Sequence, residues 1–249
     1  MEHEELLRRA EDLSRRCGKS GDVTGTFFLT PAEQAALRAW SAYGTDCTLL
    51  FHGGAPDCER QAGFFLPYYL EETDFDPAEH IRAVEIKAGF GEPEHRDYLG
   101  AVLGLGIRRE WVGDIRIFGG TAYLFCLPSV ESHILGSLDK VGRYGVKTRT
   151  VALGDVPPLE RRVKTVSFTV KSVRLDAVCA GLFGLSRTEA ARLIEAGLAS
   201  LDYLPCERCD APVREGAVLS LRGHGKGRLV SCGGQSRKGR LFVDGEIWQ

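Results

Sequence analysis

The chain has 249 residues, of which 43% are hydrophobic and 27% are charged, a composition typical of two or three folded globular domains. It contains no run of about eighteen uninterrupted apolar residues, and its acidic N-terminus differs from a signal or transit peptide, so we expect a cytoplasmic protein with no membrane partner. Most of the eight cysteines lie in apolar runs, which favours reduced core residues over a disulfide framework.

The formal net charge of −2 conceals an uneven distribution of charge along the chain. Residues 161–249 hold 15 basic and 9 acidic residues, a net charge of +6, whereas the preceding residues hold 17 basic and 25 acidic residues, a net charge of −8. No acidic residue occurs from Ala217 to Val243. Such a segment can neutralise phosphates and is the usual electrostatic sign of nucleic-acid binding. The alternative is that the basic residues of this region only form the solvent-exposed face of an amphipathic helix pair.

The N-terminal region is predicted to form an α/β domain over residues 1–77. A helix is expected over residues 2–17, with acid-before-base pairs at i,i+4, namely Glu4–Arg8, Glu5–Arg9, Glu11–Arg15 and Asp12–Arg16. A second helix is expected from Pro31 to Trp40, with proline at its first position, and a strand over residues 47–51. The aromatic stretch at residues 63–70 is predicted to be core, because bulky aromatic residues dominate cores.

The middle region, residues 78–160, alternates strands and helices. Strands are predicted at residues 84–87, 114–118, 122–127 and 145–153, with helices at residues 95–103 and from a Ser129 cap to Lys140. This βαββαβ order is the arrangement of ferredoxin-like and RNA-recognition-motif folds. The basic-glycine-aromatic signature of a true RNA-recognition motif is absent. The pattern therefore predicts the fold of this region more firmly than it predicts that RNA bases stack on its sheet.

Three arginines of the middle region flank the glycine-rich end of the predicted helix: Arg96, Arg108 and Arg109. They are placed to meet phosphate as a secondary RNA contact, with Asp97 and Asp114 orienting them. The alternative is that Asp97 caps the helix and the arginines pair with local acidic residues.

The C-terminal region, residues 165–249, is predicted to be a small α/β module. One helix is expected to run from near Ser172 to Gly184, and a second from Arg187 to Gly197 with Ser186 and Glu189 forming a capping box. Strands are expected at residues 198–204 and 217–222, followed by a basic, glycine-rich segment. The whole chain is therefore predicted to be α+β with three modules.

A set of short motifs in this region resembles the RNA-binding domain named after ribosomal small-subunit protein four. The motifs are Arg174-Leu175-Asp176, Ser186-Arg187, Gly197, Val213-x-Glu215-Gly216 and Leu221-Arg222-Gly223. Leu201-Asp202 stands where that family usually has Val-Asn, which removes one expected contact.

A wider resemblance spans nearly the full chain. The segments at residues 95–100, 105–110 and 113–115, and the order of the three modules, closely resemble the YlmH family of bacterial RNA-binding proteins. This resemblance implies binding to ribosomal or transfer RNA on the large ribosomal subunit and a part in ribosome-associated quality control of stalled translation. A link to cell division is a looser association of the same family.

The candidate RNA-binding residues contact the RNA backbone and perform no catalysis. They are Arg174, Ser186, Arg187, Thr188, Arg192, Arg222, Lys226, Arg228, Arg237, Lys238 and Arg240. We expect a non-enzymatic monomer with no cofactor and no metal.

Three alternatives are open. The first is an RNA-independent interaction protein linked to cell division, which uses the acidic N-terminal half. The second is a pseudouridine synthase, since Arg174-Leu175-Asp176 resembles the active-site stretch of those enzymes, although Val178 and Cys179 replace the acidic and hydroxyl residues expected there. The third is a zinc site at Cys206-x-x-Cys209, whose only nearby partners, His224 and Cys232, lack zinc-finger spacing.

Overall fold

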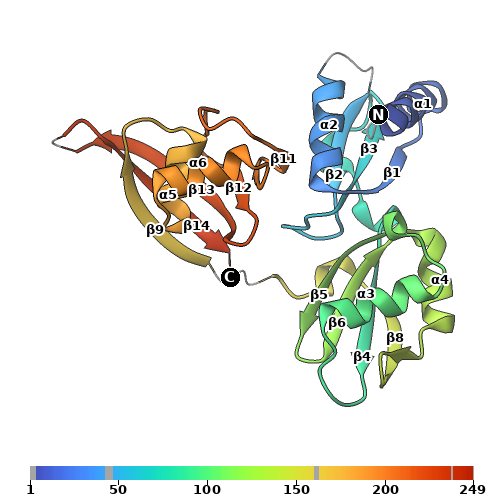
Figure 1. Ribbon diagram of the computed structural model, residues 1–249. Helices are drawn as coiled ribbons and strands as arrows, with labels where there is room; N and C mark the ends of the chain where they lie inside the picture. The colour runs from blue at the N-terminus through green and yellow to red at the C-terminus, as the bar shows by residue number, and fades with distance from the viewer. Residues whose placement is uncertain (1–3, 43–46, 160–162, 237, 249) are drawn as a thin grey trace. The chain divides into compact units, whose positions relative to one another are not determined.

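The computed structural model describes residues 4–42, 47–159, 163–236 and 238–248. The chain divides into two compact units, residues 1–159 and 160–249, which we describe in turn (Figure 1). No helix in the described residues is long and apolar enough to cross a membrane.

The first unit contains four α-helices, short 3₁₀ turns and eight strands in its described residues. In chain order they are α1 (Glu4–Ser20), β1 (Thr24–Leu29), α2 (Pro31–Ser41), β2 (Thr48–His52), β3 (Gln61–Leu66), η1 (Glu72–Asp74), η2 (Pro77–Glu79), β4 (Arg82–Ala88), α3 (His95–Gly104), η3 (Arg109–Trp111), β5 (Val112–Phe118), β6 (Thr121–Cys126), α4 (Pro128–Ser137), β7 (Lys140–Val141), β8 (Tyr144–Val151) and η4 (Leu153–Asp155).

The N-terminal part of this unit packs α1 and α2 against an antiparallel sheet in the order β1-β3-β2. Helix α1 buries Ala10, Leu13 and Cys17, one apolar stripe at helical spacing. Helix α2 starts as predicted, because Thr30 and Glu33 form a capping box ahead of the first-position proline.

The middle part of the first unit forms a five-stranded sheet in the order β5-β6-β4-β8-β7. Its four long strands, with α3 and α4, have the βαββαβ connectivity predicted from the sequence, so the predicted α+β class is confirmed. The Ser129 cap is wrong: α4 begins at Pro128 with Leu127 as its N-cap and ends at Ser137. Pro128 sets the first-turn backbone and moves the helix start back by two residues.

An apolar cluster joins the N-terminal and middle parts. Phe28, Phe64 and Phe75 share it with Ile81 and Phe125, so the predicted boundary after residue 77 falls inside one compact unit. The division of this unit into two domains stays a prediction.

The aromatic stretch at residues 63–70 divides into two halves. Phe64, Phe65 and Leu66 are buried as predicted, whereas the side chains of Tyr68 and Tyr69 are 92% and 62% exposed. The core interpretation is therefore wrong for the two tyrosines, because Pro67 ends β3 and carries the chain to the surface.

In its described residues, the second unit has one six-stranded sheet and two helices. Its elements are β9 (Val163–Val170), α5 (Leu175–Phe183), α6 (Arg187–Glu195), β10 (Ala199–Leu201), β11 (Leu204–Pro205), β12 (Val218–Leu221), β13 (Gly225–Gln235) and β14 (Leu241–Trp248). The antiparallel order is β11-β10-β12-β13-β14-β9, and Figure 1 shows α5 and α6 against this sheet. The central strands bury Leu219, Leu221, Leu229 and Val243 under the helices.

The start of α5 differs from the prediction. The helix begins at Leu175 and not near Ser172, because its N-cap Arg174 is extended and forms a β-bridge with Pro212. In this bridge the N–H of Val213 donates to Val173 O, and the N–H of Leu175 donates to Ala211 O. The end at Gly184 is confirmed, with left-handed φ of 69°.

The segment after residue 222 also differs from the prediction, since most of it is strand β13. Gly227 is required inside this strand, because a Cβ there would lie 2.3 Å from Glu246 O on β14. The close pairing of two backbones therefore explains Gly227 in a segment whose glycine content is otherwise typical of a loop.

Candidate nucleic-acid interface

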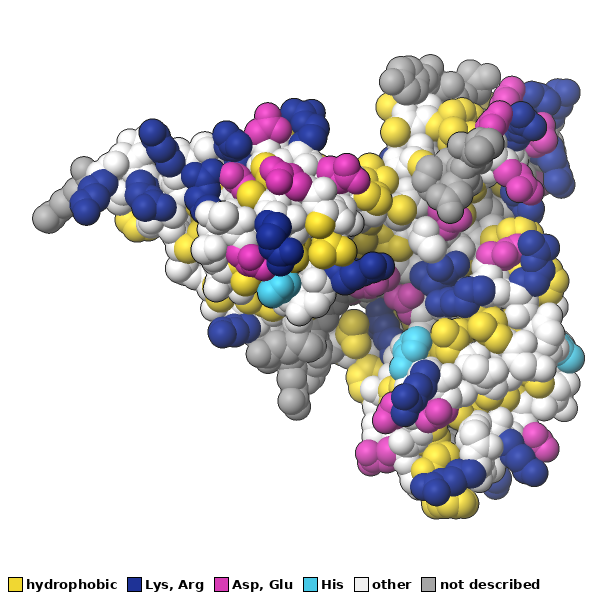
Figure 2. Space-filling model, in the orientation of Figure 1, with side chains coloured by type: hydrophobic (Ala, Val, Ile, Leu, Met, Phe, Trp, Pro, Cys, Tyr) yellow, Lys and Arg dark blue, Asp and Glu magenta, His cyan; other side chains and the backbone are white. Residues whose placement is uncertain are grey.

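Lys and Arg side chains gather along the arm that β13 and β14 form in the second unit (Figure 2). Beside this arm, between β9 and α5, lies a hollow of about 200 Å³ that three cations line: Lys171, Arg187 and Arg240. We call it the cationic hollow. It brings together residues separated by up to 69 positions, the distance in sequence from Lys171 to Arg240.

Arg187, the first residue of α6, is fixed in the cationic hollow by a buried acid. Its Nη2 donates to Asp176 Oδ2 at 2.5 Å, and the Asp176 side chain is only 9% exposed. Asp176 also accepts the N–H of Ala177 at 2.8 Å and lies 3.5 Å from Arg174 Nε. One buried carboxylate thus orients two guanidinium groups, and the trio keeps one net positive charge.

The other predicted helix residues surround the start of α6. Ser186 caps α6 by accepting the N–H of Glu189 at 3.1 Å, and Thr188 is exposed. The second half of the predicted capping box is not seen, because the Glu189 carboxylate instead accepts from Arg192 at 2.7 Å. That contact lowers the pKa of Glu189 below its ordinary value.

Two predicted cations lie on the opposite face of the sheet. Lys226 and Arg228 flank Gly227, whose own Cβ position faces Leu182 of α5, so alternation along β13 directs both side chains away from the helices. Arg228 pairs with Glu246 at 2.9 Å. The Lys226 ammonium lies 4.3 Å and 4.8 Å from the ring centres of Tyr203 and Trp248.

The remaining predicted cations of the second unit lie in turns. Arg222 is exposed between β12 and β13, and Lys238 is exposed between β13 and β14. Arg240 donates to Thr169 O at 2.8 Å, which ties β14 to β9 beside the cationic hollow. Arg237 lies outside the described residues. The structure therefore divides the predicted residues between two faces, and it adds Lys171, which the sequence analysis did not include in the site.

The three arginines of the middle part form local contacts. Arg96 pairs with Glu94 at 3.1 Å, and Arg108 pairs with Glu110 at 2.5 Å. Arg109 donates to the carbonyl oxygens of Val112 and Gly113, and burial lowers its pKa. Asp97 caps α3 by accepting the N–H of Glu94. This is the arrangement of the alternative interpretation, and the secondary RNA contact stays a prediction.

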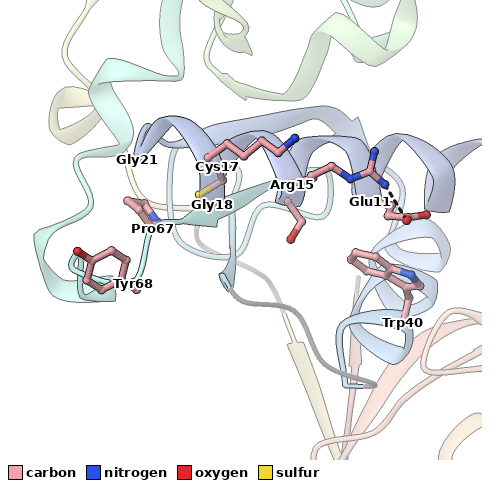
Figure 3. Close-up of a pocket in the computed structure, with 10 residues that line it drawn as sticks. Glu11, Arg15, Cys17, Gly18, Gly21, Trp40, Pro67 and Tyr68 are labelled. Atoms are coloured by element: carbon pink, nitrogen blue, oxygen red, sulfur yellow. Dashed lines mark hydrogen bonds and ion pairs between the residues drawn. The ribbon is translucent and has the colours of Figure 1, made fainter.

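A larger hollow of about 590 Å³ lies in the first unit (Figure 3). Helix α1 forms one wall with the Glu11–Arg15 ion pair, while Trp40 and Tyr68 come from α2 and the segment after β3. Its one thiol, Cys17, is buried, which together with the neighbouring Cys47 raises its pKa to about 12. Cys17 is therefore protonated at neutral pH and is a poor nucleophile.

Two cysteines of the second unit, Cys206 and Cys209, contact neighbouring oxygen atoms. Cys209 Sγ lies 3.6 Å from Ala191 O and 3.7 Å from Glu195 Oε1, and Cys206 Sγ lies 3.9 Å from Arg208 O. Within residues 4–42, 47–159, 163–236 and 238–248, no three His, Cys, Asp or Glu side chains are grouped as metal ligands.

The fold and these surfaces define an α+β protein that joins a ferredoxin-like sheet to a small α/β unit with an exposed cationic hollow. Comparison with known proteins agrees with this class. The family model described as "Putative RNA-binding domain in YlmH" matches residues 71–155, which cover the middle part of the first unit.

One relative matches nearly the whole chain. The "Ribosome-associated protein quality control protein P2" of Bacillus subtilis is 32% identical over 225 residues, which are 88% of this chain and 84% of the relative. The solved structure titled "Cell division protein ylmH from Streptococcus pneumoniae" matches with a TM-score of 0.54 and 19% identity, over 64% of this chain and 96% of that one; this likeness concerns the fold. The chain belongs to the YlmH family.

Proposed function

We propose that this protein binds ribosomal or transfer RNA on the large ribosomal subunit and acts in ribosome-associated quality control of stalled translation. The observation that carries the proposal is the cationic hollow, where Lys171, Arg187 and Arg240 converge at the start of a helix. Structured RNA is recognised mainly through its backbone and shape, and such a cluster contacts phosphates without a base code. The name of the Bacillus relative and the matched family model support this assignment.

The finer assignments follow from the same reasoning. The second unit acts as an RNA-binding domain of the small-subunit-protein-four type, with Arg174, Thr188, Arg192, Arg222 and Lys238 extending the contact around the cationic hollow. The protein is a cytoplasmic monomer that binds RNA without catalysis, cofactor or metal. Asp176, the residue that a pseudouridine synthase would use, is already bonded to Arg187 and to the N–H of Ala177, which favours binding over chemistry.

Lys226 and Arg228 serve this function differently. Both are placed on the face of the sheet opposite to the helices, and each is engaged by neighbours, Arg228 by Glu246 and Lys226 by two rings. We assign them to stabilising the sheet and expect their replacement to change RNA affinity less than replacement of Lys171 or Arg240.

Salt-dependent binding of the full chain tests the proposal. The double variant Lys171→Ala/Arg240→Ala removes two cations of the hollow and leaves the Arg187–Asp176 pair intact. With ribosomal RNA and transfer RNA as probes, it should reduce the slope of log K against log salt by about 1.4 to 1.8, since each lost phosphate contact removes roughly 0.7 to 0.9.

A matched control removes two cations elsewhere. Arg8 is 77% exposed on α1 and pairs with Glu4, and Arg143 is exposed between β7 and β8. The variant Arg8→Ala/Arg143→Ala should keep the wild-type slope. If the wild-type chain binds neither RNA, or if both variants match it, the proposal is wrong and the RNA-independent partner linked to cell division becomes the function to test.

A further inference from the structure

Two aromatic rings and two arginines lie in successive contact on the first unit. Phe27 of β1 and Trp111 of η3 have ring centres 6.3 Å apart at an interplanar angle of 55°. The guanidinium carbon of Arg9, on α1, lies 3.9 Å from the centre of the Phe27 ring, and that of Arg108 lies 5.8 Å from the Trp111 ring. We call Arg9, Phe27, Trp111 and Arg108 the arginine–aromatic ladder.

The ladder explains a pairing that the sequence mispredicted. Arg9 was expected to pair with Glu5 along α1; among the ion pairs of the described residues it has none with Glu5, and its guanidinium rests on Phe27 instead. A guanidinium held flat on a ring loses conformational freedom and keeps its N–H edge available for hydrogen bonds. The rings therefore hold two arginines in place for a ligand.

Two further arginines lie beside the ladder. Nη2 of Arg60 donates to Phe28 O at 2.8 Å, while its Nε is buried without a hydrogen-bond partner in the described part of the chain. Arg109 binds the carbonyl oxygens of Val112 and Gly113. Burial lowers the pKa of Arg60, and burial together with the charge of Arg60 lowers the pKa of Arg109, so positive charge is concentrated here.

The acidic residues near this cluster are already engaged. Glu110 binds Arg108 at 2.5 Å, Asp114 accepts the backbone N–H groups of Glu59 and Arg60, and Glu33 accepts from Thr30 in the α2 capping box. With these three acids engaged, guanidinium groups of the ladder remain at the surface: Arg9 is exposed, and the Arg108 side chain is 62% exposed.

We infer that the arginine–aromatic ladder is a second RNA-binding surface, which holds the phosphate backbone of an RNA segment through Arg9 and Arg108. Guanidinium groups bind phosphate through paired N–H donors, and their outer planes stack on unpaired bases. The inference rests on the proposed RNA-binding function and names a surface outside the second unit. Of the three arginines predicted as a secondary contact, Arg108 belongs to the ladder and Arg109 lies beside it, whereas Arg96 takes no part in it.

The test measures binding of the full chain to ribosomal RNA by filter binding over a salt series. The variant Arg9→Ala/Arg108→Ala should bind about tenfold more weakly at roughly 0.15 M salt, with a slope smaller by about 1.4 to 1.8. The control Arg8→Ala/Arg143→Ala removes the neighbouring α1 arginine and one from the β7–β8 turn. That turn lies at the opposite edge of the sheet from β5, which follows Trp111 directly, so the control should bind as wild type.

A second variant tests the rings without changing charge. Phe27→Leu keeps an apolar side chain and removes the ring beneath Arg9. The RNA affinity should fall about threefold, because the Arg9 side chain is no longer held in place. The slope of log K against log salt should stay the same, because no charge is removed. Thermal unfolding should show that each variant is folded at the binding temperature.

The outcomes separate this inference from the proposed function. If the ladder variant binds like its control while Lys171→Ala/Arg240→Ala weakens binding, the ladder inference is overturned and the proposed function stands. If the ladder variant keeps its affinity for RNA but no longer sediments with ribosomes, the ladder binds a ribosomal protein and the inference is again overturned. If the wild-type chain binds no RNA, both the proposed function and the ladder inference are wrong.

Discussion

Removing Arg187 should destabilise the second unit as well as weaken RNA binding. Its partner Asp176 has a side chain only 9% exposed, while the Arg187 side chain is 60% exposed. Breaking a buried ion pair costs about 3 to 5 kcal/mol, and an exposed pair contributes roughly 0 to 1 kcal/mol. Because Asp176 keeps the N–H of Ala177 and lies near Arg174, we expect Arg187→Ala to lower the free energy of unfolding by about 2 kcal/mol.

Arg192 provides the matched comparison on the same helix. Its pair with Glu189 is exposed on both sides, at 66% and 41%, so Arg192→Ala should leave the free energy of unfolding unchanged. Hydrogen exchange of peptides from residues 163–248, followed as urea is raised, reports the second unit separately from the first, which is necessary because the two units can unfold in separate transitions.

A double-mutant cycle isolates the pair itself. With Asp176→Asn as the second substitution, the coupling energy between residues 176 and 187 should be about 1 to 2 kcal/mol, close to the value for hydrogen-bonded neighbours. Equal urea midpoints for Arg187→Ala and Arg192→Ala would refute the reasoning, since they would show that the buried carboxylate does not need Arg187.

Three further predictions concern packing, pH and thiol reactivity. Gly181→Ala should destabilise the second unit by roughly 1 to 3 kcal/mol, because the new Cβ would lie 2.1 Å from the Phe168 ring. Gly100→Ala has open space around it in α3 and should stabilise the first unit by about 0.5 to 1 kcal/mol. Urea unfolding measures both changes. His52 accepts the N–H of Gly54, and burial lowers the pKa of His52. Its contribution to stability is therefore present above about pH 6.5 and is lost as pH falls toward the lowered pKa. Urea midpoints at pH 7.5 and 5.5 should differ less in His52→Asn than in wild type. Burial raises the pKa of Cys126 to about 12, so a maleimide at pH 8 should label it only on unfolding, which peptide mass spectrometry detects.

Local signals in the sequence predict the helices well. The Thr30–Glu33 capping box, the apolar stripe of α1 and the left-handed glycine that ends α5 all act within a few residues. The two caps draw their energy from neighbouring residues, and the helical period of the stripe marks the buried face of α1 whatever packs against it, so capping residues and periodicity are sufficient to predict these helices.

The strands of the second unit needed information that local patterns lack. β9 and β14 pair along their full lengths, from Leu241↔Val170 to Trp248↔Val163, although these partners are 71 and 85 positions apart in the sequence. Strand β13 is glycine-rich, a composition that disfavours strands, and the close approach of Glu246, which explains Gly227, comes from a strand that is distant in the sequence.

The candidate sites also depend on contacts between residues that are distant in the sequence. Residue type identifies the cations, but the register of β13 decides that Lys226 and Arg228 face away from Arg187, and the fold decides that Lys171 and Arg240 meet. The arginine–aromatic ladder joins α1, β1 and η3, and Arg9 had a plausible partner four residues away in Glu5. Tertiary contact with Phe27 prevailed over that local pair, because cation–π contact with an ordered ring competes well with an exposed ion pair.

Sedimentation of the full chain with ribosomes through sucrose gradients tests the central proposal most directly. We predict that the wild-type protein travels with the large ribosomal subunit at low salt, is released as salt is raised, and that Lys171→Ala/Arg240→Ala is released at lower salt than Arg8→Ala/Arg143→Ala. A wild-type protein that stays at the top of the gradient at every salt concentration would contradict the account.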